Sequence, residues 1–157
     1  MAIVTRRISI AKPPAIVWEQ LADIEGQSRW MRDLKEVRVT SPGPIGVGTR
    51  AVGRVRMFGL PAADPIEIDA WEPGRHLGLR HLGRFTGRGD VWLAADGAGG
   101  TAARWREALS PDPARLGLPR PAAAAWRLLD PGFGLMLAIV FRADLRRLKR
   151  LVEGGGP

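Results

Sequence analysis

The chain has no cysteine and only two histidines, His76 and His81. Without cysteine there can be neither a disulfide framework nor a thiolate-bound metal. Two histidines also leave few ligands for any other metal site, so we expect no metal and no cofactor. The common catalytic signatures are missing as well, because the sequence contains no HExxH, no phosphate-binding loop and no Ser-His-Asp order.

Segments for export and for crossing a membrane are not found either. The N-terminus lacks the apolar core of a secretion signal. The longest uninterrupted apolar run, Leu135 to Phe141, is far shorter than the roughly 20 residues that a membrane-spanning helix needs. We therefore expect a cytoplasmic protein without a transmembrane segment. Peripheral contact with a membrane surface stays open.

Lysine is scarce, and arginine carries most of the formal net charge of +8. The only lysines are Lys12, Lys35 and Lys149, while arginines are spread from Arg6 to Arg150. Positive charge that is spread in this way, without a recognition motif, is not typical of a nucleic-acid interface. We expect no nucleic-acid partner. The abundance of Arg, Ala, Gly and Pro is typical of a G+C-rich bacterial genome.

The length and the hydrophobic content predict one compact domain. A chain of 157 residues with 45% hydrophobic residues is long enough to bury a sizeable core. We expect a single ligand-binding domain over 1–153 and a flexible tail over 154–157. The sequence does not decide between a monomer and a homodimer.

Hydrophobic periodicity predicts strands with helices near both ends of the chain. Val4, Ile8 and Ile10 share one face of a strand over 3–11. A helix begins at Pro14, and a second short helix ends at Trp30. Six more strands are expected at 34–40, 49–58, 65–72, 75–82, 84–95 and 101–110, and their hairpin-length connections predict an antiparallel sheet.

The C-terminal part is predicted to be helical after a Pro-rich loop over 111–121. We expect a short helix at 122–129 and a long helix at 131–152. Asp130 and Pro131 suit the cap and the first position of the long helix, because Asp accepts from free backbone N–H groups and Pro has no N–H to satisfy.

Four stretches of the chain resemble a known superfamily. The strand and Pro-initiated helix of residues 8–30 resemble the opening of SRPBCC proteins, which include START-like domains and the polyketide cyclase/dehydrase family. Later parts resemble its turns and its last helix. These parts are Gly46-Val-Gly48-Thr49, Trp71-Glu-Pro-Gly-Arg-His-Leu77 and Arg142-Ala-Asp-Leu-Arg-Arg-Leu-Lys-Arg-Leu-Val152.

The resemblance implies a fold and a class of function. The fold is the α+β helix-grip, in which a seven-stranded curved antiparallel sheet wraps around a long C-terminal helix, with two short helices between strands 1 and 2. A mostly apolar cavity lies between sheet and helix. The implied function is binding or transport of a hydrophobic small molecule, such as a lipid, an isoprenoid quinone or a polyketide, and the alternative is a polyketide cyclase/dehydrase-like enzyme.

Strand alternation predicts which side chains face this cavity. On the last strand the less charged face, with Trp105 and Glu107, is expected to point inward. Several inward positions are glycine or alanine, which leaves room for a ligand or lets the sheet curve around the helix; both interpretations remain open. The expected ligand contacts are Trp30, Met57, Trp71, Phe85, Trp105, Ala138 and Phe141.

The opposite face of the sheet is rich in arginine. We expect cross-strand ion pairs with carboxylates on a solvent-exposed surface rather than a docking site. The residues are Arg50, Arg54, Arg56, Arg80, Arg88, Arg104 and Arg106, with Glu67, Asp69 and Asp90.

The long helix has one apolar face for the sheet and further apolar residues on its other side. Phe141, Leu145 and Leu148 recur at helical spacing and are expected to press on the sheet. Leu135 and Ile139 lie on the other side and need a cover. We expect the 122–129 helix to supply it, with a second subunit or a membrane surface as the alternatives.

Glu107 and His81 are the candidate catalytic residues. A carboxylate and an imidazole that face an apolar cavity are suited to transfer protons. The simpler interpretation, which we prefer at this point, pairs Glu107 with an arginine at the cavity rim and makes His81 a polar residue at the end of a strand. Since an enzyme needs polar groups deep in the cavity, and the sequence offers few, a carrier is the preferred function.

Overall fold

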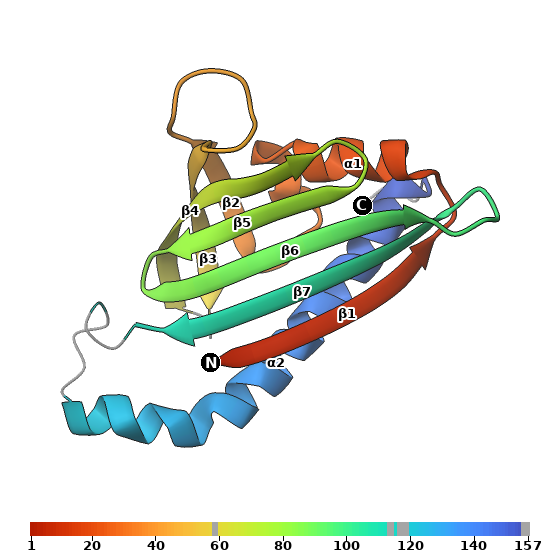
Figure 1. Ribbon diagram of the computed structural model, residues 1–157. Helices are drawn as coiled ribbons and strands as arrows, with labels where there is room; N and C mark the ends of the chain where they lie inside the picture. The colour runs from red at the N-terminus through yellow and green to blue at the C-terminus, as the bar shows by residue number, and fades with distance from the viewer. Residues whose placement is uncertain (58–59, 113–114, 116–119, 155–157) are drawn as a thin grey trace.

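The computed structural model describes residues 1–57, 60–112, 115 and 120–154, with backbone alone at 57, 60, 111 and 120–131. Among these residues, seven strands form one antiparallel sheet in the order β1-β7-β6-β5-β4-β3-β2 (Figure 1). The elements are β1 (Ala2–Ile10), α1 (Pro14–Ala22), η1 (Glu25–Arg29), β2 (Leu34–Val39), β3 (Arg50–Met57), β4 (Leu60–Glu72), β5 (His76–Leu82), β6 (Phe85–Ala95), β7 (Thr101–Pro111) and α2 (Arg120–Val152).

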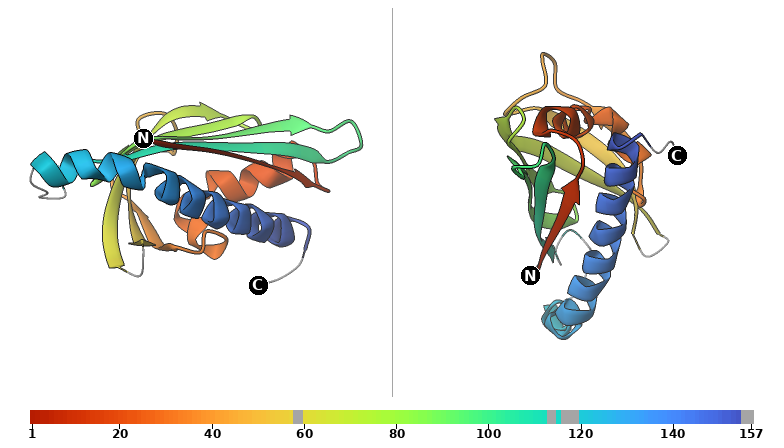
Figure 2. Two further views of the ribbon diagram at one scale, coloured as in Figure 1. Left: turned by 90° about the horizontal axis from the view of Figure 1, so that it is seen from below. Right: turned by 90° about the vertical axis from the view of Figure 1, so that its right-hand side faces the viewer.

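The predicted helix-grip architecture is confirmed. The long helix α2 crosses one face of the sheet, while α1 and η1 lie between β1 and β2 in the chain (Figures 1 and 2). Burial follows the predicted apolar stripe, because Phe141, Leu145 and Leu148 are all buried in the core. The Trp105 ring of β7 stacks on Phe141, with 4.6 Å between ring centroids. Sheet and helix therefore share one hydrophobic core.

The short helices bring Trp30 into this core. Pro14 stands at the start of α1, whose buried face carries Val17, Trp18 and Leu21. The Gln27 side chain of η1 donates a buried hydrogen bond to the Leu21 carbonyl, at 3.0 Å. This bond satisfies a carbonyl near the end of α1 and holds the two helices together. Trp30, which follows η1, is buried as a result.

Strand β4 is longer than predicted. It begins at Leu60 rather than at residue 65, and it includes Pro61 and Pro65. Between residues 60 and 65 it pairs with β3, whereas its pairing with β5 begins only at Ile66, opposite His81. On the side that faces β5, residues 60–65 therefore have no strand partner. A proline, which has no N–H to donate, is tolerated there. The extension places Asp64 in the sheet.

The two predicted C-terminal helices form a single helix of 33 residues. The predicted start at Asp130 and Pro131 is wrong, since the helix continues through both positions. A proline in a helix interior removes one backbone hydrogen bond and favours a bend. Figure 1 shows α2 changing direction where its N-terminal part extends beyond the sheet.

This continuity also corrects the predicted cover of the helix. Because 122–129 belongs to the same helix as Leu135 and Ile139, it does not fold back over them. Leu135 and Ile139 are 65% and 64% exposed. The predicted loop over 111–121 and the predicted tail lie largely outside the described residues, with Gly154 described at the end of the chain.

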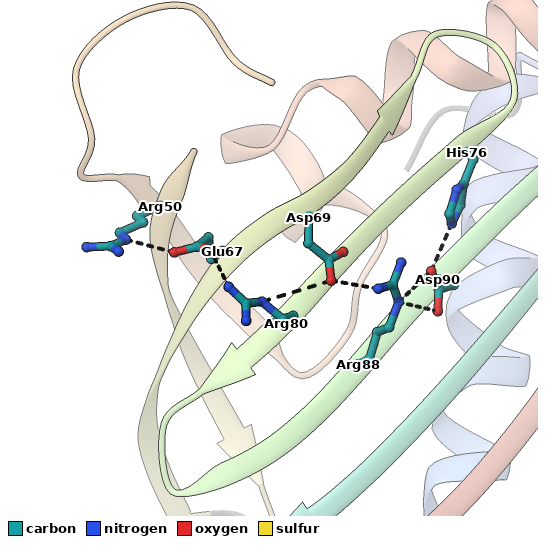
Figure 3. Close-up of polar contacts among 7 residues, drawn as sticks. All are labelled: Arg50, Glu67, Asp69, His76, Arg80, Arg88 and Asp90. Atoms are coloured by element: carbon teal, nitrogen blue, oxygen red, sulfur yellow. Dashed lines mark hydrogen bonds and ion pairs between the residues drawn. The ribbon is translucent and has the colours of Figure 1, made fainter. Parts of the chain in front are cut away.

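The predicted cross-strand ion pairs are confirmed on the outer face of the sheet (Figure 3). Glu67 binds both Arg50 and Arg80, with N···O distances of 2.9 and 2.5 Å. Arg88 binds Asp69 and Asp90, at 2.7 and 2.9 Å. Three of these pairs join the four neighbouring strands β3 to β6, while the Arg88–Asp90 pair lies within β6.

Other members of the predicted arginine set have different surroundings. The Arg104 guanidinium lies over the Trp92 ring, 4.2 Å from its centroid. Arg54 pairs with Glu36 of β2 at 3.3 Å. Arg56 is also exposed but belongs to the lining of the cavity described next.

Candidate functional site

A cavity of about 150 Å³ lies between the sheet and α2. Aliphatic and aromatic side chains from both layers form most of its wall. Trp30, Phe85, Trp105 and Phe141 line it, as predicted from sequence. Its remaining apolar wall includes Leu21, Leu34, Val55, Leu77, Leu79, Val91, Leu109, Met136, Leu137 and Val140.

Two of the predicted contacts lie elsewhere, and a third cannot be placed. Trp71 does not line the cavity but packs edge-on against Trp18, with 4.9 Å between ring centroids. Ala138 is buried under β1, where its carbonyl accepts a hydrogen bond from Arg6 Nε at 3.2 Å. The Met57 side chain lies outside the described residues. That the lining residues contact a ligand stays a prediction.

Three charged side chains from neighbouring parts of the sheet form a cluster in the cavity wall. His81 of β5 stands between two carboxylates, with 2.8 Å from Nδ1 to Asp64 Oδ2 and 2.9 Å from Nε2 to Glu107 Oε1. The strand register produces this arrangement, because His81 pairs with Gly87 of β6 and Glu107 pairs with Gly89 two residues further along. We call these residues the Asp64–His81–Glu107 cluster.

Glu107 faces the cavity, and its pairing differs from the preferred sequence-based interpretation. It binds His81 rather than an arginine, and its Oε2 accepts a hydrogen bond from Trp105 Nε1 at 2.9 Å. Its side chain is only 4% exposed. Gly89 makes room for the carboxylate, since a Cβ built at this residue would lie 2.6 Å from Glu107 Oε2. Both oxygens of a buried carboxylate are therefore satisfied.

The cluster keeps His81 protonated. Burial alone would lower the pKa of His81, but hydrogen bonds to Asp64 and Glu107, together with their negative charge, outweigh it and raise the pKa to about 10. At neutral pH the ring is therefore an imidazolium that donates both of its N–H groups to carboxylates. Such a group holds a charge at a fixed place in an apolar wall.

A fourth carboxylate comes from the helix. Asp144 of α2 is 1% exposed, lines the cavity and accepts a hydrogen bond from the Arg32 backbone N–H at 2.9 Å. Burial and, to a smaller extent, the nearby charge of Asp33 raise the pKa of Asp144 to about 6, against the opposing effect of that hydrogen bond. Asp33 also lines the cavity. The helix and the residue just before β2 thus add acidic groups to the wall.

One polar atom of the wall has no partner. The indole Nε1 of Trp30 is buried and forms no hydrogen bond with any described residue. The Trp30 ring meets Trp105 edge-on, with 5.9 Å between centroids. Trp105 in turn donates to Glu107. The Trp30 ring therefore packs against the indole that donates to Glu107.

Sequence reasoning missed Asp64 and Asp144. Asp64 preceded the strand predicted at 65–72, so it was never assigned a face. Asp144 follows Phe141 by three residues and precedes Leu148 by four. That spacing places it on the buried stripe of the helix, and the pattern contained a signal for an inward carboxylate.

Metal-binding and membrane-spanning features are not found in the described part of the chain. No group of three or more His, Cys, Asp or Glu side chains there is arranged to hold a metal ion. None of the described helices combines the length and the apolar character needed to span a bilayer.

Solved structures with the same fold cover nearly the whole chain. A Deinococcus radiodurans protein is 24% identical, with 99% of each chain covered and a TM-score of 0.70. A Streptomyces aromatase/cyclase is 18% identical, with 99% of this chain and 98% of the other covered and a TM-score of 0.70. A Mycobacterium smegmatis START superfamily protein is 13% identical, with 98% and 96% covered and a TM-score of 0.69.

The family assignment rests on the sequence itself. No curated protein matches the chain. The family described as "Polyketide cyclase / dehydrase and lipid transport" matches residues 1–153. Because this match covers almost the entire sequence, the chain belongs to the polyketide cyclase/dehydrase and lipid transport family.

Proposed function

We propose that this protein binds or transports a hydrophobic small molecule in the cavity between the sheet and α2. One observation carries the proposal: the cavity wall is mainly aliphatic and aromatic, and it contains the single Asp64–His81–Glu107 cluster among the described residues. An apolar wall supplies affinity, while a few fixed polar groups orient the ligand. Lipids, isoprenoid quinones and polyketide-like molecules have the required chemistry.

The state of His81 favours an anchoring role over a catalytic one. A general acid or base works best when its pKa lies near the working pH. The pKa of His81 is raised to about 10, so the ring neither takes up nor releases a proton readily near neutral pH. Both of its N–H groups are also engaged. The cluster is therefore better suited to hold the polar end of a ligand.

Family membership supports the class of function without selecting the ligand. The family description includes cyclases, dehydrases and lipid transport. The aromatase/cyclase and the START superfamily protein share the fold at low identity, and a shared fold alone does not specify chemistry. In this proposal Trp30, Phe85, Trp105 and Phe141 form the contact surface for the ligand. Trp71 and Ala138 support the surrounding core.

A cavity-filling variant tests the binding function. Ala62 of β4 lines the cavity, whereas Ala102 of β7 is exposed on the opposite face. Ala62→Phe should place a phenyl ring in the cavity, and Ala102→Phe is the matched control. We expect the wild type and the control, titrated with a fatty alcohol, an isoprenoid quinone or an aromatic polyketide, to change tryptophan emission at micromolar concentration. Ala62→Phe should respond much less.

Co-purified molecules provide a second readout of the same proposal. Native mass spectrometry should find a small molecule on the wild type and on Ala102→Phe, and less of it on Ala62→Phe. Thermal unfolding of the three proteins establishes that both variants fold. If the wild type binds none of the three ligand classes and carries no small molecule, the binding function is contradicted.

Acid–base catalysis of the cyclase/dehydrase kind is the second candidate, and the His81–Glu107 contact inside the cavity favours it. An enzyme of this kind should accelerate exchange of the acetyl methyl protons of 4-methylacetophenone, which lie next to its carbonyl, for deuterium, followed by proton NMR in D₂O. General acid–base catalysis typically contributes about 10²–10⁴-fold. Glu107→Gln should abolish that acceleration and leave ligand binding largely intact. Exchange at the rate of the protein-free solution would argue against catalysis.

A further inference from the structure

The solvent-facing side of α2 carries one continuous stripe of exposed side chains. At about 100° of rotation per residue, its members fall within an arc of about 80° on the helix. Leu137, Phe141 and Leu148 are buried on the opposite side. The stripe is apolar in its first part and basic in its last part. Its members, which we call the α2 stripe, are Leu135, Ile139, Arg142, Arg146 and Arg150.

The apolar part of the stripe lies on the turns of α2 that also form the cavity wall. Leu135 and Ile139 are 65% and 64% exposed and stand one turn apart. Two exposed aliphatic side chains at this spacing form a surface that is favourably removed from water. The residue after each of them, Met136 and Val140, lines the cavity. A partner that covers the apolar part would therefore lie against the same turns as the ligand.

The basic part of the stripe carries charge that is not neutralised. Among the described residues, no carboxylate pairs with any of its three arginines. Between residues 132 and 154 the only acidic residues are Asp144 and Glu153. Asp144 is buried in the cavity wall, and Glu153 pairs with Lys149 at 2.6 Å. On the outer face of the sheet, by contrast, carboxylates pair with several arginines. The charge of the stripe is therefore complementary to an anionic partner.

The surface of an anionic bilayer matches both parts of the stripe. Aliphatic side chains of a helix that lies on a membrane enter the boundary between head groups and acyl chains. Arginines bind phosphate oxygens and are attracted to the negative charge of the leaflet. A nucleic acid would use the arginines alone. In a twofold dimer the stripe would face itself, and Arg142, at its middle, would meet the same arginine of the second copy.

We propose that the α2 stripe docks the protein on the surface of a membrane that contains anionic phospholipids. Leu135 and Ile139 enter the interface, and the three arginines bind head-group phosphates. The contact is peripheral, because only one side of the helix takes part. This inference goes beyond the proposed binding function and does not depend on it. Where both hold, docking brings the cavity-lining turns of α2 to the bilayer, which is the natural source or destination of a hydrophobic ligand.

Vesicle flotation tests the docking. The wild type should float with vesicles of phosphatidylcholine that contain about one third phosphatidylglycerol, and it should not float with pure phosphatidylcholine, because the arginines need a negative surface. A triple variant with Arg142→Gln, Arg146→Gln and Arg150→Gln should bind the anionic vesicles roughly a hundredfold more weakly, since each arginine near such a surface contributes about fivefold. A wild type that does not float with the anionic vesicles would overturn the inference.

A second triple variant separates the stripe from the overall charge. Arg7, Arg50 and Arg54 are exposed arginines on the outer face of the sheet. Their combined replacement by Gln lowers the net charge by the same amount and should weaken vesicle binding by less than about fivefold, because these side chains face away from the bilayer. Equal losses in the two triple variants would mean that overall charge drives binding, and the inference would be wrong.

The apolar part has its own test. Leu135→Ala combined with Ile139→Ala should weaken binding to the anionic vesicles at least about tenfold, because less apolar surface enters the interface. Val47→Ala is the control, since Val47 is 69% exposed in the connection between β2 and β3. All altered side chains are exposed, so thermal unfolding should match the wild type.

Two results with the Leu135→Ala/Ile139→Ala variant would contradict the docking. Vesicle binding equal to that of the wild type would mean that neither residue enters the bilayer. Analytical ultracentrifugation of the wild type and this variant provides the other result. A wild-type dimer that the double substitution dissociates would assign the apolar part to a second copy of the chain. We expect both proteins to have the same mass in solution without vesicles.

Discussion

Asp144 of α2 accepts a hydrogen bond from the backbone N–H of Arg32, across 2.9 Å, and so joins the long helix to the segment between η1 and β2. Burial raises the pKa of Asp144 to about 6 from an ordinary value of 3.8, so the folded protein resists its ionisation. The folded state therefore holds more protons than the unfolded state between these values. By linkage, the contribution of Asp144 to stability falls as pH rises from about 4 to about 6.

Asp144→Asn tests whether the buried charge of Asp144 lowers the stability of the folded protein. The amide oxygen can still accept from Arg32, while the charge is removed, so the variant should be more stable than the wild type at pH 7 by roughly 2 kcal/mol. The difference should be much smaller at pH 4. Urea denaturation at both pH values measures it. Asp144→Ala, which removes the acceptor as well, is the control and should not gain the same stability.

His81 is expected to stay protonated through the neutral range. Its pKa is raised from 6.5 to about 10, so its contribution to stability is complete below about 6.5 and is lost as pH rises through about 10. A pH titration of the His81 ring signals by NMR should show no deprotonation between pH 5 and 8. A midpoint near 6.5 would show that the two carboxylates do not hold the charge.

Removal of the His81 ring charge should expose the carboxylates to each other. His81→Phe leaves the buried Glu107 and the partly exposed Asp64 without their cation, and the loss of one partner from a buried ion pair typically costs about 3–5 kcal/mol. The loss should be smaller near pH 10.5, because the wild type has then also lost the charge of His81. Urea denaturation at pH 7 and at about pH 10.5 compares the two. An equal loss at both pH values would indicate that lost packing, rather than charge, dominates.

Ion pairs on the outer face should contribute more to the stability of the protein when they are buried than when they are exposed. Asp90 is buried and is bound by Arg88 and His76 (Figure 3). Burial raises the pKa of Asp90, but hydrogen bonds from Arg88 and His76 outweigh this and lower it. Arg88→Ala should therefore destabilise the protein by about 1–3 kcal/mol, because a buried charge loses its main partner.

Arg50→Ala is the matched control for the Arg88 variant. Arg50 is exposed and its pair with Glu67 is solvated, so its loss should lie within the error of a stability measurement. Because the pKa of Asp90 is lowered, the effect of Arg88→Ala should shrink as pH falls below about 4, where Asp90 takes up a proton on unfolding. Equal effects of the two variants at pH 7 would contradict the role of burial.

The fold could be predicted from sequence because its signals are local and repeated. Alternation along β7 assigned Trp105 and Glu107 to the inside correctly, since one face of that strand is less charged. The site could be predicted only in part. Glu107 and His81 were predicted together as cavity-facing candidates, whereas the hydrogen bond between them depends on the register of three strands, which residue patterns do not determine.

The failures have specific physical causes. Asp64 was missed because the strand was predicted to begin at residue 65, whereas β4 begins at Leu60 and includes Pro61, on a stretch that does not pair with β5 and so tolerates proline. The helix was divided at Asp130 and Pro131 because this pair is typical of a helix start. In the folded chain the helix continues through both residues, and a proline inside a helix favours a bend rather than a stop.

The orientation of α2 gives a final prediction, through two leucines of the same helix. Leu148 is fully buried against the sheet, whereas Leu135 is 65% exposed. Leu148→Ala should cost about 2–5 kcal/mol, because it removes apolar contacts and leaves a cavity. Leu135→Ala should change stability by less than about 0.5 kcal/mol. Urea denaturation of both variants at two protein concentrations measures the difference. If Leu135→Ala causes a large loss of stability that grows with protein concentration, a second copy of the chain covers this face. If its loss of stability equals that of Leu148→Ala at every concentration, the orientation of the helix is contradicted.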